Sequence, residues 1–410
     1  MSNIHHSEQV IIVGGGGAGL GAAAELSRAG VPVIVLEAAA LGAQASTHNQ
    51  GWLYSGGIFA RTDVEFAQLC WQSAQKTIRD FPQCLEHGRK SEAAGMYFVS
   101  SQAGTVMSEW RKAWDQAGIP FKVVTRNEFF RDVPHVNKEL IQQVYLLPDR
   151  AFRPEILLED LAALARNAGA EIRTHTKVAE LLIADGAVQG VKTSTGEILS
   201  ANHVILSTGS VLDELVPPRK QLEYGQPAFE RVNVKTHLAA IRPDLSHMPF
   251  TFVDWHELNH IPHMQTSVFH SGRWLPTKDG HDTQIDPHEM ARLWDDIQTL
   301  FPKLNRSTLG HQREWAATTT QAMRSNQVTP GSVSRPVIVN HGANGGPQRL
   351  WSASTGRLTL WPVVAEKLRR EILAQLTRGP LIASAPPWGL SDEKSGSASI
   401  CKPKTESKSL

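Results

Sequence analysis

The stretch that decides the fold lies near the N-terminus, where Gln9 to Glu37 reads QVIIVGGGGAGLGAAAELSRAGVPVIVLE. The apolar run Val10 to Val13 predicts a buried strand, and Ala22 to Ala29 predicts a helix that ends at Gly30. A second apolar run, Val31 to Leu36, predicts another strand, which is followed at once by the acid Glu37. This order of elements predicts the first βαβ unit of an α/β fold.

The glycines between the first strand and the helix have the spacing G-x-G-x-x-G, at Gly14, Gly16 and Gly19. The first glycine permits a tight turn, the second lets the backbone approach a pyrophosphate, and the third lets helix and strand pack closely. The helix N-terminus then offers free N–H groups to phosphates, and Glu37 can hold a ribose hydroxyl. The alternative is a purely structural glycine turn. We favour a site for an adenine dinucleotide, and the motif by itself leaves open which one.

Composition narrows the class of protein. The 410 residues suffice for one large domain or two intertwined domains, and 41 Lys plus Arg against 40 Asp plus Glu give no net field that selects nucleic acid. Cys70, Cys84 and Cys401 have no metal-ligand spacing, which indicates a reducing compartment without disulfides and predicts no metal site. No apolar run has transmembrane length, and no signal peptide is evident. We expect a cytoplasmic protein, with peripheral membrane contact left open.

Later segments alternate between two kinds of pattern. Pro148 to Gly209 predicts a helix starting at Pro154, then short strands with a hairpin at Asp185-Gly186, and Val204 to Leu206 as a strand before Ser207-Thr208-Gly209. In contrast, Gly95 to Leu147 and Gln221 to Ala322 alternate aromatic and polar residues, as an antiparallel sheet does, with helices at Met107 to Ala117 and Pro287 to Leu300.

We therefore predict a Rossmann-like dinucleotide domain, a parallel sheet with helices, that is interrupted by an antiparallel-sheet substrate domain of α+β type. The predicted dinucleotide-domain parts are 9–90, 148–215 and 331–377; the substrate-domain parts are 91–147 and 216–330; and 378–410 is a disordered tail of Pro, Ser, Lys and Gly. Cofactor and substrate are expected to meet at the domain interface.

Three separated segments together resemble the D-amino-acid oxidase superfamily of FAD enzymes. The first is the glycine segment. The second, Ala45 to Phe66 (ASTHNQGWLYSGGIFARTDVEF), is similar to the H-N-S-G-x-x-H-S-G of L-2-hydroxyglutarate dehydrogenases and to the H-G-G region of FAD-dependent glycerol-3-phosphate dehydrogenases. The third, Ser354 to Glu366 (STGRLTLWPVVAE), is similar to the latter family's G-G-K-L-T-T-x-x-x-x-A-E. The resemblance covers about Gln9 to Gln375.

The resemblance implies FAD as the cofactor and a set of residues that hold it. By resemblance, the turn at Gly356 to Thr359 lies at the carbonyl edge of the flavin ring, where its N–H groups would stabilise negative charge. The implied cofactor residues are Gly14, Gly16, Gly19, Glu37, Ala45, Ser46, His48, Val178, Gly209, Gly356, Arg357, Leu358 and Thr359. His48 matches a histidine that is covalently joined to the flavin in dimethylglycine-dehydrogenase relatives, and both attachment and its absence stay open.

The same resemblance implies a small anionic substrate. Arg324 and Arg335 fit the places of the glycerophosphate family's two substrate arginines, and Arg357, which stands where that family has lysine, is a third cation near the ring. Surface ion pairs are the alternative for each of these arginines. The family's candidate base, a histidine, is replaced here by Tyr54, an unusual base because a phenol titrates near pH 10.

A group of histidines in the predicted substrate domain supplies other candidates for the base, of which we name His263 or His260. His256 and His270 belong to the same group, and structural roles or a metal site are the alternatives. Trp52, Trp255, Trp274 and Trp315 lie in segments expected to border the pocket, with ordinary core positions as the alternative.

Together these features predict an FAD-dependent oxidoreductase that removes a hydride from the CH–OH or CH–NH carbon of a hydroxy acid, polyol phosphate or amino acid. Oxygen or a quinone would be the electron acceptor. Three alternatives stay open: an amine or amino-acid oxidase that releases imine and hydrogen peroxide, a nicotinamide-dependent dehydrogenase, and a flavin-binding protein without catalysis, which the loss of histidine at Tyr54 favours.

Overall fold

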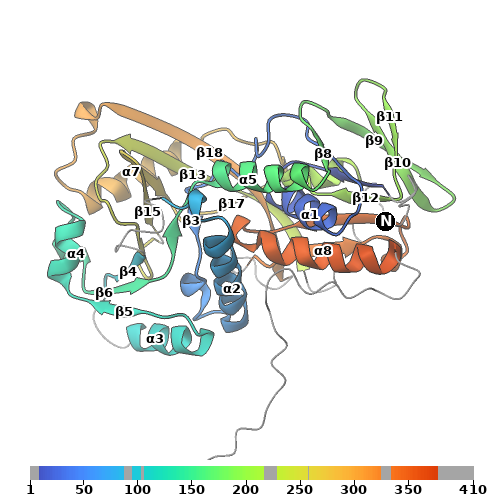
Figure 1. Cartoon of the computed structure of the whole chain (residues 1–410). Helices are drawn as coiled ribbons and strands as arrows, with labels where there is room; N and C mark the ends of the chain where they lie inside the picture. The colour runs from blue at the N-terminus through green and yellow to red at the C-terminus, as the bar shows by residue number, and fades with distance from the viewer. Residues whose placement is uncertain are drawn as a thin grey trace, which may run out of the picture.

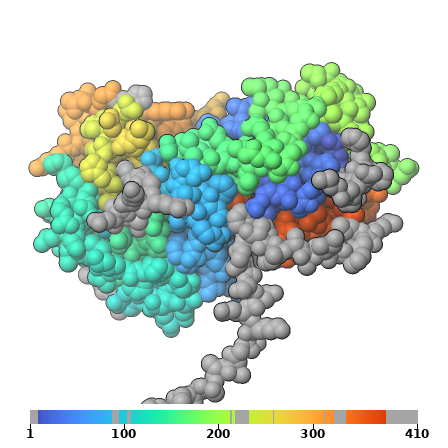
Figure 2. All heavy atoms as spheres, viewed as in Figure 1, coloured from blue at the N-terminus to red at the C-terminus, as the bar shows by residue number. Residues whose placement is uncertain are grey.

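The computed structural model describes residues 9–86, 95–102, 106–216, 229–256, 258–324 and 334–376. The predicted tail, 378–410, lies outside the described residues, and so does the side chain of Arg324. Figure 1 shows two lobes side by side, one around α1, α8 and β12 and the other around α7, β4 and β6. In the space-filling view, helices α2 (Val64–Asp80, blue) and α5 (Pro154–Asn167, green) cover the region between the lobes (Figure 2).

The first lobe is built on a sheet whose strands come from three distant parts of the chain. Within the described residues this sheet has six strands in the order β19-β20-β12-β1-β2-β8. All neighbouring strands are parallel except β19 and β20, which form an antiparallel pair. The strand bounds are β1 Val10–Val13, β2 Val33–Leu36, β8 Glu171–Arg173, β12 His203–Leu206, β19 Val337–Asn340 and β20 Leu350–Ser354. The parallel order places the carboxyl ends of β1, β2 and β12 at one edge, where dinucleotides bind in such sheets.

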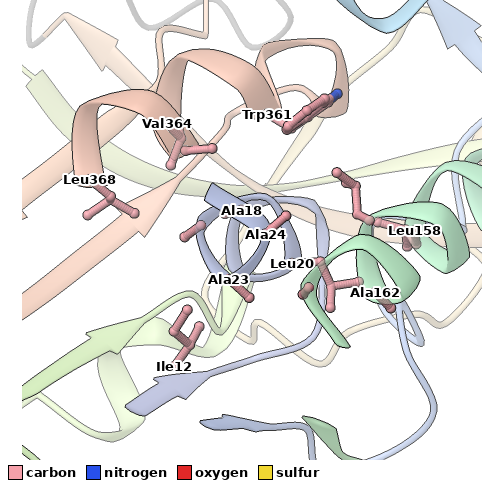
Figure 3. Close-up of a cluster of buried hydrophobic side chains, with 14 of the residues drawn as sticks. Ile12, Ala18, Leu20, Ala23, Ala24, Leu158, Ala162, Trp361, Val364 and Leu368 are labelled. Atoms are coloured by element: carbon pink, nitrogen blue, oxygen red, sulfur yellow. The ribbon is translucent and has the colours of Figure 1, made fainter. Parts of the chain in front are cut away.

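Helix α1 (Gly17–Arg28) holds this lobe together. It lies between α5 and α8 (Trp361–Leu376), with Leu20 and Ala24 among the apolar side chains that fill the space (Figure 3). Its small residues permit close approach, because a Cβ on Gly21 would lie 2.9 Å from Cε3 of Trp361. The helix starts at Gly17, five residues earlier than the predicted Ala22 and inside the glycine motif. Its first turn faces the sheet edge.

The second lobe is a larger sheet that is antiparallel except at the pair β4 and β14. Within the described ranges it has nine strands in the order β17-β13-β16-β15-β14-β4-β6-β5, and β18 pairs with β13 along its whole length. The bounds are β4 Met96–Ser100, β5 Lys122–Val124, β6 Gln143–Leu147, β13 Phe229–Arg242, β14 Phe250–Phe252, β15 Asn259–His263, β16 Thr266–His270, β17 Leu275–Thr277 and β18 His311–Arg324. Helices α3 (Val106–Ala117), α4 (Arg126–Asp132) and α7 (Pro287–Leu300) accompany it.

Two small sheets complete the part of the fold that the structure describes. Strands β9 (Val178–Ala184), β10 (Ala187–Thr193) and β11 (Ile198–Ser200) form a meander, with the predicted turn at Asp185-Gly186 in the positive-φ conformation of a hairpin. Strand β3 (Trp52–Leu53) pairs with β7 (Arg150–Ala151), so that the second resemblance segment is fixed to the chain ahead of α5. Among the described residues, no helix is both long and apolar enough to span a membrane.

Candidate active site

The glycine motif forms the floor of a groove at the carboxyl edge of the parallel sheet. Gly14 has a φ of +109°, and a Cβ on it would lie 2.5 Å from the carbonyl oxygen of Ser207 at the end of β12. A Cβ on Gly19 would lie 2.0 Å from the carbonyl oxygen of Gly14. Gly16 is the N-terminal cap of α1, so the N–H groups of the first helical turn point toward the groove. Backbone contact therefore requires glycine at Gly14 and Gly19, whereas a Cβ on Gly16 would lie 2.9 Å from Ser46 Oγ.

The rest of the groove has the size and chemistry that a dinucleotide needs. Its empty space, with the open solvent at its mouth included, is about 1640 Å³. Glu37, at the end of β2, accepts hydrogen bonds from Gly15 N at 2.6 Å and Ala39 N at 2.9 Å, which holds its carboxylate at the groove wall. The predicted cofactor residues that line it are Gly14, Gly16, Glu37, Ala45, Ser46, Val178, Gly209 and Gly356.

The three segments that carry the resemblance meet at one end of this groove. The backbone N–H of Gly17 donates to Ser46 Oγ at 3.2 Å, and a Cβ on Gly17 would lie 2.2 Å from Cδ1 of Leu358. The backbone N–H of Tyr54 donates to Thr359 Oγ1 at 3.2 Å. This bond joins residues 305 positions apart in the sequence. Thr359 itself lines neither the groove nor the neighbouring cavity, so its contact with the site is through the Tyr54 backbone.

A second cavity opens from the groove at this meeting point, toward the large sheet. Its empty space, with open solvent included, is about 740 Å³, and it shares Ala45, Ser46, Thr319, Thr355 and Gly356 with the groove. Aromatic rings and uncharged polar groups make up much of its wall: Trp52, Tyr54, Phe152, Trp274, His48, Asn49, Gln50, Thr236 and Thr319. A substrate in this cavity would therefore lie directly against the inner end of a bound dinucleotide.

Arg357 carries the one permanent charge among the described side chains that line this cavity. Its guanidinium lies 5.1 Å from the ring centroid of Tyr54 and 4.5 Å from that of Phe59. Such stacking holds the planar guanidinium in one orientation. The position fits an anion in the cavity.

The hydroxyl of Tyr54 accepts a hydrogen bond from a neighbouring side chain of the cavity wall. Its ring stacks on Trp52 with centroids 4.2 Å apart, and Gln50 Nε2 donates to its hydroxyl oxygen at 3.2 Å. Burial raises the pKa of the Tyr54 phenol, and the positive charge of Arg357 offsets this only in part. The phenol therefore keeps its proton at neutral pH, which argues against Tyr54 as a base.

A buried carboxyl group supports the wall from behind. Asp149 Oδ1 accepts from Trp52 Nε1 at 2.8 Å and from Ser55 N at 2.9 Å, while Ser55 Oγ donates to Oδ2. Asp149 is fully buried, and burial raises its pKa to about 6 against the stabilising hydrogen bonds from Ser55 and Trp52. The segment that carries Tyr54 is thus held by an acid outside the three resemblance segments.

His48 lies in the cavity wall with a defined tautomer. Its Nδ1 lies 3.0 Å from the carbonyl oxygen of Gln44, which can only accept, so the proton of a neutral ring is on Nδ1. The lone pair is then on Nε2. His48 was predicted as a cofactor residue, and its ring lines the substrate side of the junction.

The other predicted bases lie elsewhere. His263 Nε2 bonds the carbonyl oxygen of Gln50 at 2.8 Å and Nδ1 bonds Glu86 at 2.9 Å, which places the ring behind the cavity wall. His260 is fully buried, bonds Ser267 Oγ and has its pKa lowered to about 3 by burial. We therefore assign neither ring to the reaction. No group of metal ligands occurs among the described residues.

The structure does not bring the three predicted substrate arginines together in the cavity, among the residues that it describes. Arg335 donates to Asp63 Oδ2 at 2.6 Å, beside the N-terminus of α2, and is absent from the lining of the cavity. Arg335 thus forms an ion pair, which was the alternative to a substrate role. Arg324 ends β18, and its side chain lies outside the described residues. Of the four tryptophans expected at the pocket, Trp52 and Trp274 line the cavity, whereas Trp255 packs on Phe252 and Trp315 bonds the carbonyl oxygen of His48.

Several lining residues escaped the sequence interpretation. Thr236 and Leu238 of β13, together with Ala317 and Thr319 of β18, form one face of the long paired strands and close the cavity. The i, i+2 spacing in both strands is the signal that could have placed them on one face. Nothing in the sequence says which face meets the flavin segments.

Comparison with known proteins agrees with this geometry. The family model described as FAD-dependent oxidoreductase (DAO) matches residues 9–360. The chain belongs to this family. Its curated relatives include the anaerobic glycerol-3-phosphate dehydrogenase subunit A1 of Haloferax volcanii, 29% identical over 223 residues, which are 50% of this chain and 36% of that protein. The glycine oxidase of Pseudomonas aeruginosa is 29% identical over 222 residues, 52% of this chain and 58% of that protein. The chain thus spans about a third to a half of the length of such relatives.

Solved structures share the fold of this DAO-family chain. The glycine oxidase of Bacillus cereus superposes with a TM-score of 0.70 at 18% identity, covering 90% of this chain and 96% of that one. The FAD-bound L-α-glycerophosphate oxidase of Mycoplasma pneumoniae gives 0.68 at 17% identity, covering 90% and 95%. The predicted fold class, the resemblance and FAD as cofactor are confirmed. The glycine cradle and the groove fit that cofactor, whereas the domain boundaries and individual site residues stay predictions.

Proposed function

We propose that this protein oxidises the carbon that bears a hydroxyl or amine group in a small carboxylic acid, with FAD as the hydride acceptor. The observation that carries the proposal is Arg357, which lies against the rings of Tyr54 and Phe59 in a cavity whose other described lining residues include no acid. One guanidinium matches the single charge of a carboxylate and can hold both of its oxygens. A phosphate dianion would leave charge uncompensated by the described lining.

Three side chains divide the remaining work. Bound FAD supplies an electron-pair acceptor at the junction of groove and cavity. Arg357 binds the carboxylate, and the protonated Tyr54 hydroxyl, whose oxygen already accepts from Gln50, donates its hydrogen to the substrate. As a hydride leaves the substrate carbon, His48 Nε2 takes the proton of the hydroxyl or amine, which leaves a C=O or C=N bond. The aromatic walls exclude water from this step.

The relatives support the class of reaction without deciding the substrate. By name, one acts on glycerol 3-phosphate and another on glycine. A polyol phosphate, an amine oxidised to an imine with release of hydrogen peroxide, and flavin binding without catalysis are the competing outcomes. The electron acceptor, oxygen or a quinone, and the cytoplasmic location stay predictions.

Anaerobic mixing of the holoenzyme with 2-hydroxy acids, amino acids and glycerol 3-phosphate tests the proposal through bleaching of the flavin absorbance. We expect at least one carboxylic acid to reduce the flavin. Bleaching by glycerol 3-phosphate alone would reassign the substrate class, and no bleaching by any compound would favour the non-catalytic alternative. Admitting oxygen to the reduced enzyme and measuring hydrogen peroxide then identifies an oxidase.

The matched pair Arg357→Met and Arg335→Met separates the two arginines. Loss of a buried charge partner of a carboxylate costs about 2–3 kcal/mol, so we expect KM for the acid to rise roughly 100-fold in Arg357→Met. Arg335→Met is expected to keep KM, because Arg335 pairs with Asp63 outside the cavity. An equal rise in both variants would contradict the assignment of Arg357.

A further inference from the structure

One face of the long ladder between β13 and β18 supplies the cavity with a hydroxyl group in a fixed environment. Thr236 lies opposite Ala317 in β18, and both line the cavity with Leu238 two positions along. Thr236 is only 4% exposed. A hydroxyl group this enclosed has few directions in which to donate its hydrogen, so its hydrogen bonds decide what it offers to a ligand.

The partner of Thr236 is His270, at the end of β16. Thr236 Oγ1 lies 2.9 Å from His270 Nε2. The other ring nitrogen, Nδ1, lies 3.1 Å from the backbone N of Gly272, which can only donate. Nδ1 of His270 must therefore be an unprotonated acceptor, and the same nitrogen lies 3.1 Å from Asn259 Nδ2.

These contacts fix which atom donates in each hydrogen bond from Gly272 through His270 to Thr236. His270 is buried, and burial together with the charges of Arg357 and Arg273 lowers its pKa to about 3, so the ring is neutral at physiological pH. A neutral ring with a bare Nδ1 carries its hydrogen on Nε2, which donates to Thr236 Oγ1. Thr236 accepts from His270 and has no second partner among the described residues, so its own hydrogen is left for the cavity.

We propose that Thr236 donates its hydroxyl hydrogen to the carboxylate of the substrate, and that His270 is the positioning residue that sets the direction of this hydrogen. The proposal rests on the proposed function, since it takes the carboxylate bound by Arg357 as the acceptor. The effect of Arg357 on the pKa of His270 indicates that the guanidinium lies within electrostatic reach of this relay. Arg357, Tyr54 and Thr236 together offer donors to a group of oxygens, which selects an oxyanion over an ammonium group.

The test uses the FAD-loaded protein and small carboxylates as probes. Acetate and benzoate are titrated into the holoenzyme, and the change in flavin absorbance gives Kd. A hydrogen bond to a charged acceptor predicts that Thr236→Val weakens binding about tenfold and that Thr236→Ser, which keeps the hydroxyl, binds within about threefold of wild type. Thr251→Val is the matched control, a buried threonine of the same sheet that does not line the cavity, and is expected to bind like wild type.

The role of His270 is tested by comparing the carboxylate Kd of single and double variants at Thr236 and His270. His270→Phe removes the donor to Thr236, whereas the amide N–H of His270→Gln can replace it. We expect His270→Phe to weaken carboxylate binding, His270→Gln to restore most of it, and the double variant Thr236→Val/His270→Phe to bind no more weakly than Thr236→Val. Additive losses in the double variant would show that His270 acts only on the packing of the sheet.

The outcomes separate this inference from the function beneath it. Wild type that responds to no carboxylate overturns the proposed function and the role of Thr236 with it. Wild type that binds carboxylates while Thr236→Val binds them equally well overturns the inference alone. A change in the flavin spectrum of ligand-free Thr236→Val, with Kd unaltered, would assign the hydroxyl to the cofactor and also overturn it.

Discussion

The groove and the cavity of this protein meet at Gly356, yet backbone atoms shape the first and side chains shape the second. The groove is formed by backbone: a Cβ at Gly14 or Gly19 would collide with a carbonyl oxygen, and the first turn of α1 presents N–H groups. The cavity is formed by side chains from both lobes, with a charge at Arg357 and hydroxyl groups at Tyr54 and Thr236. Close backbone contacts require glycines at fixed spacing, which can be read in the local sequence. Single substitutions can instead change the chemistry of a wall built of side chains. We therefore propose that the groove serves the cofactor and that the cavity selects the substrate.

The strongest way to break the comparison is to add a side chain to the groove. Gly19→Val would place its Cβ 2.0 Å from the carbonyl oxygen of Gly14, so we expect the purified protein to lose nearly all of its flavin. The ratio of flavin to protein absorbance measures this loss. Gly310→Ala is the control, because a Cβ there meets nothing within 4 Å. Full flavin content in Gly19→Val would mean that the groove tolerates side chains as the cavity does.

A change at the junction is expected to affect the reaction while leaving the cofactor in place. General base catalysis contributes about 10²–10⁴-fold, so His48→Gln is expected to lower kcat by at least about 100-fold with unchanged flavin content. Acid precipitation of the wild type is expected to leave yellow colour in the supernatant, as a non-covalent flavin does. A yellow pellet would assign His48 to covalent attachment, and an unchanged kcat would remove it as the base.

The smallest expected effect concerns the support of the cavity wall. The folded state keeps the proton of Asp149 up to about pH 6, whereas the unfolded chain releases it near pH 3.8. Between these values the folded state binds more protons, so the free energy of unfolding falls as pH rises, by about 2–3 kcal/mol. Asp149→Asn can keep the bonds to Trp52 and Ser55 but does not ionise.

We therefore expect the stability difference between wild type and Asp149→Asn to shift in favour of the variant as pH rises from about 4 to 6, and to be constant above that. Urea unfolding of both proteins at several pH values measures this difference, in which all other titrating groups cancel. A difference that does not change with pH would mean that Asp149 ionises in the folded state as it does in the unfolded chain.

Features of the fold that depend on neighbouring residues were predictable from the sequence. The helix start at Pro154, the hairpin at Asp185-Gly186 and the helix Pro287–Leu300 lie where the patterns predicted them. Each depends on short-range rules of capping, turn conformation or periodicity. The start of α1 was missed because its first turn consists of glycine and alanine, whose apolar periodicity is weak, although Gly16 caps it.

Features of the site that depend on pairing between distant residues were not predictable in this way. Arg335 and Arg357 both stand among uncharged residues in the sequence, yet one pairs with Asp63 and the other lines the cavity. His263 and His270 lie seven residues apart, and the first bonds Glu86 behind the wall while the second bonds Thr236 at the cavity. In each case the deciding partner lies far away along the chain or in a neighbouring strand.

The sequence by itself determined that this chain binds a dinucleotide on a βαβ unit, because glycine spacing and strand–helix order are local constraints on the backbone. The other two resemblance segments narrowed that dinucleotide to FAD. The tertiary structure decided which charge, which hydroxyls and which imidazole line the cavity, because these depend on the packing of β13 and β18 against segments hundreds of residues away. A side chain's hydrogen-bond partners set its protonation and direction, and those partners are chosen only when the sheets assemble.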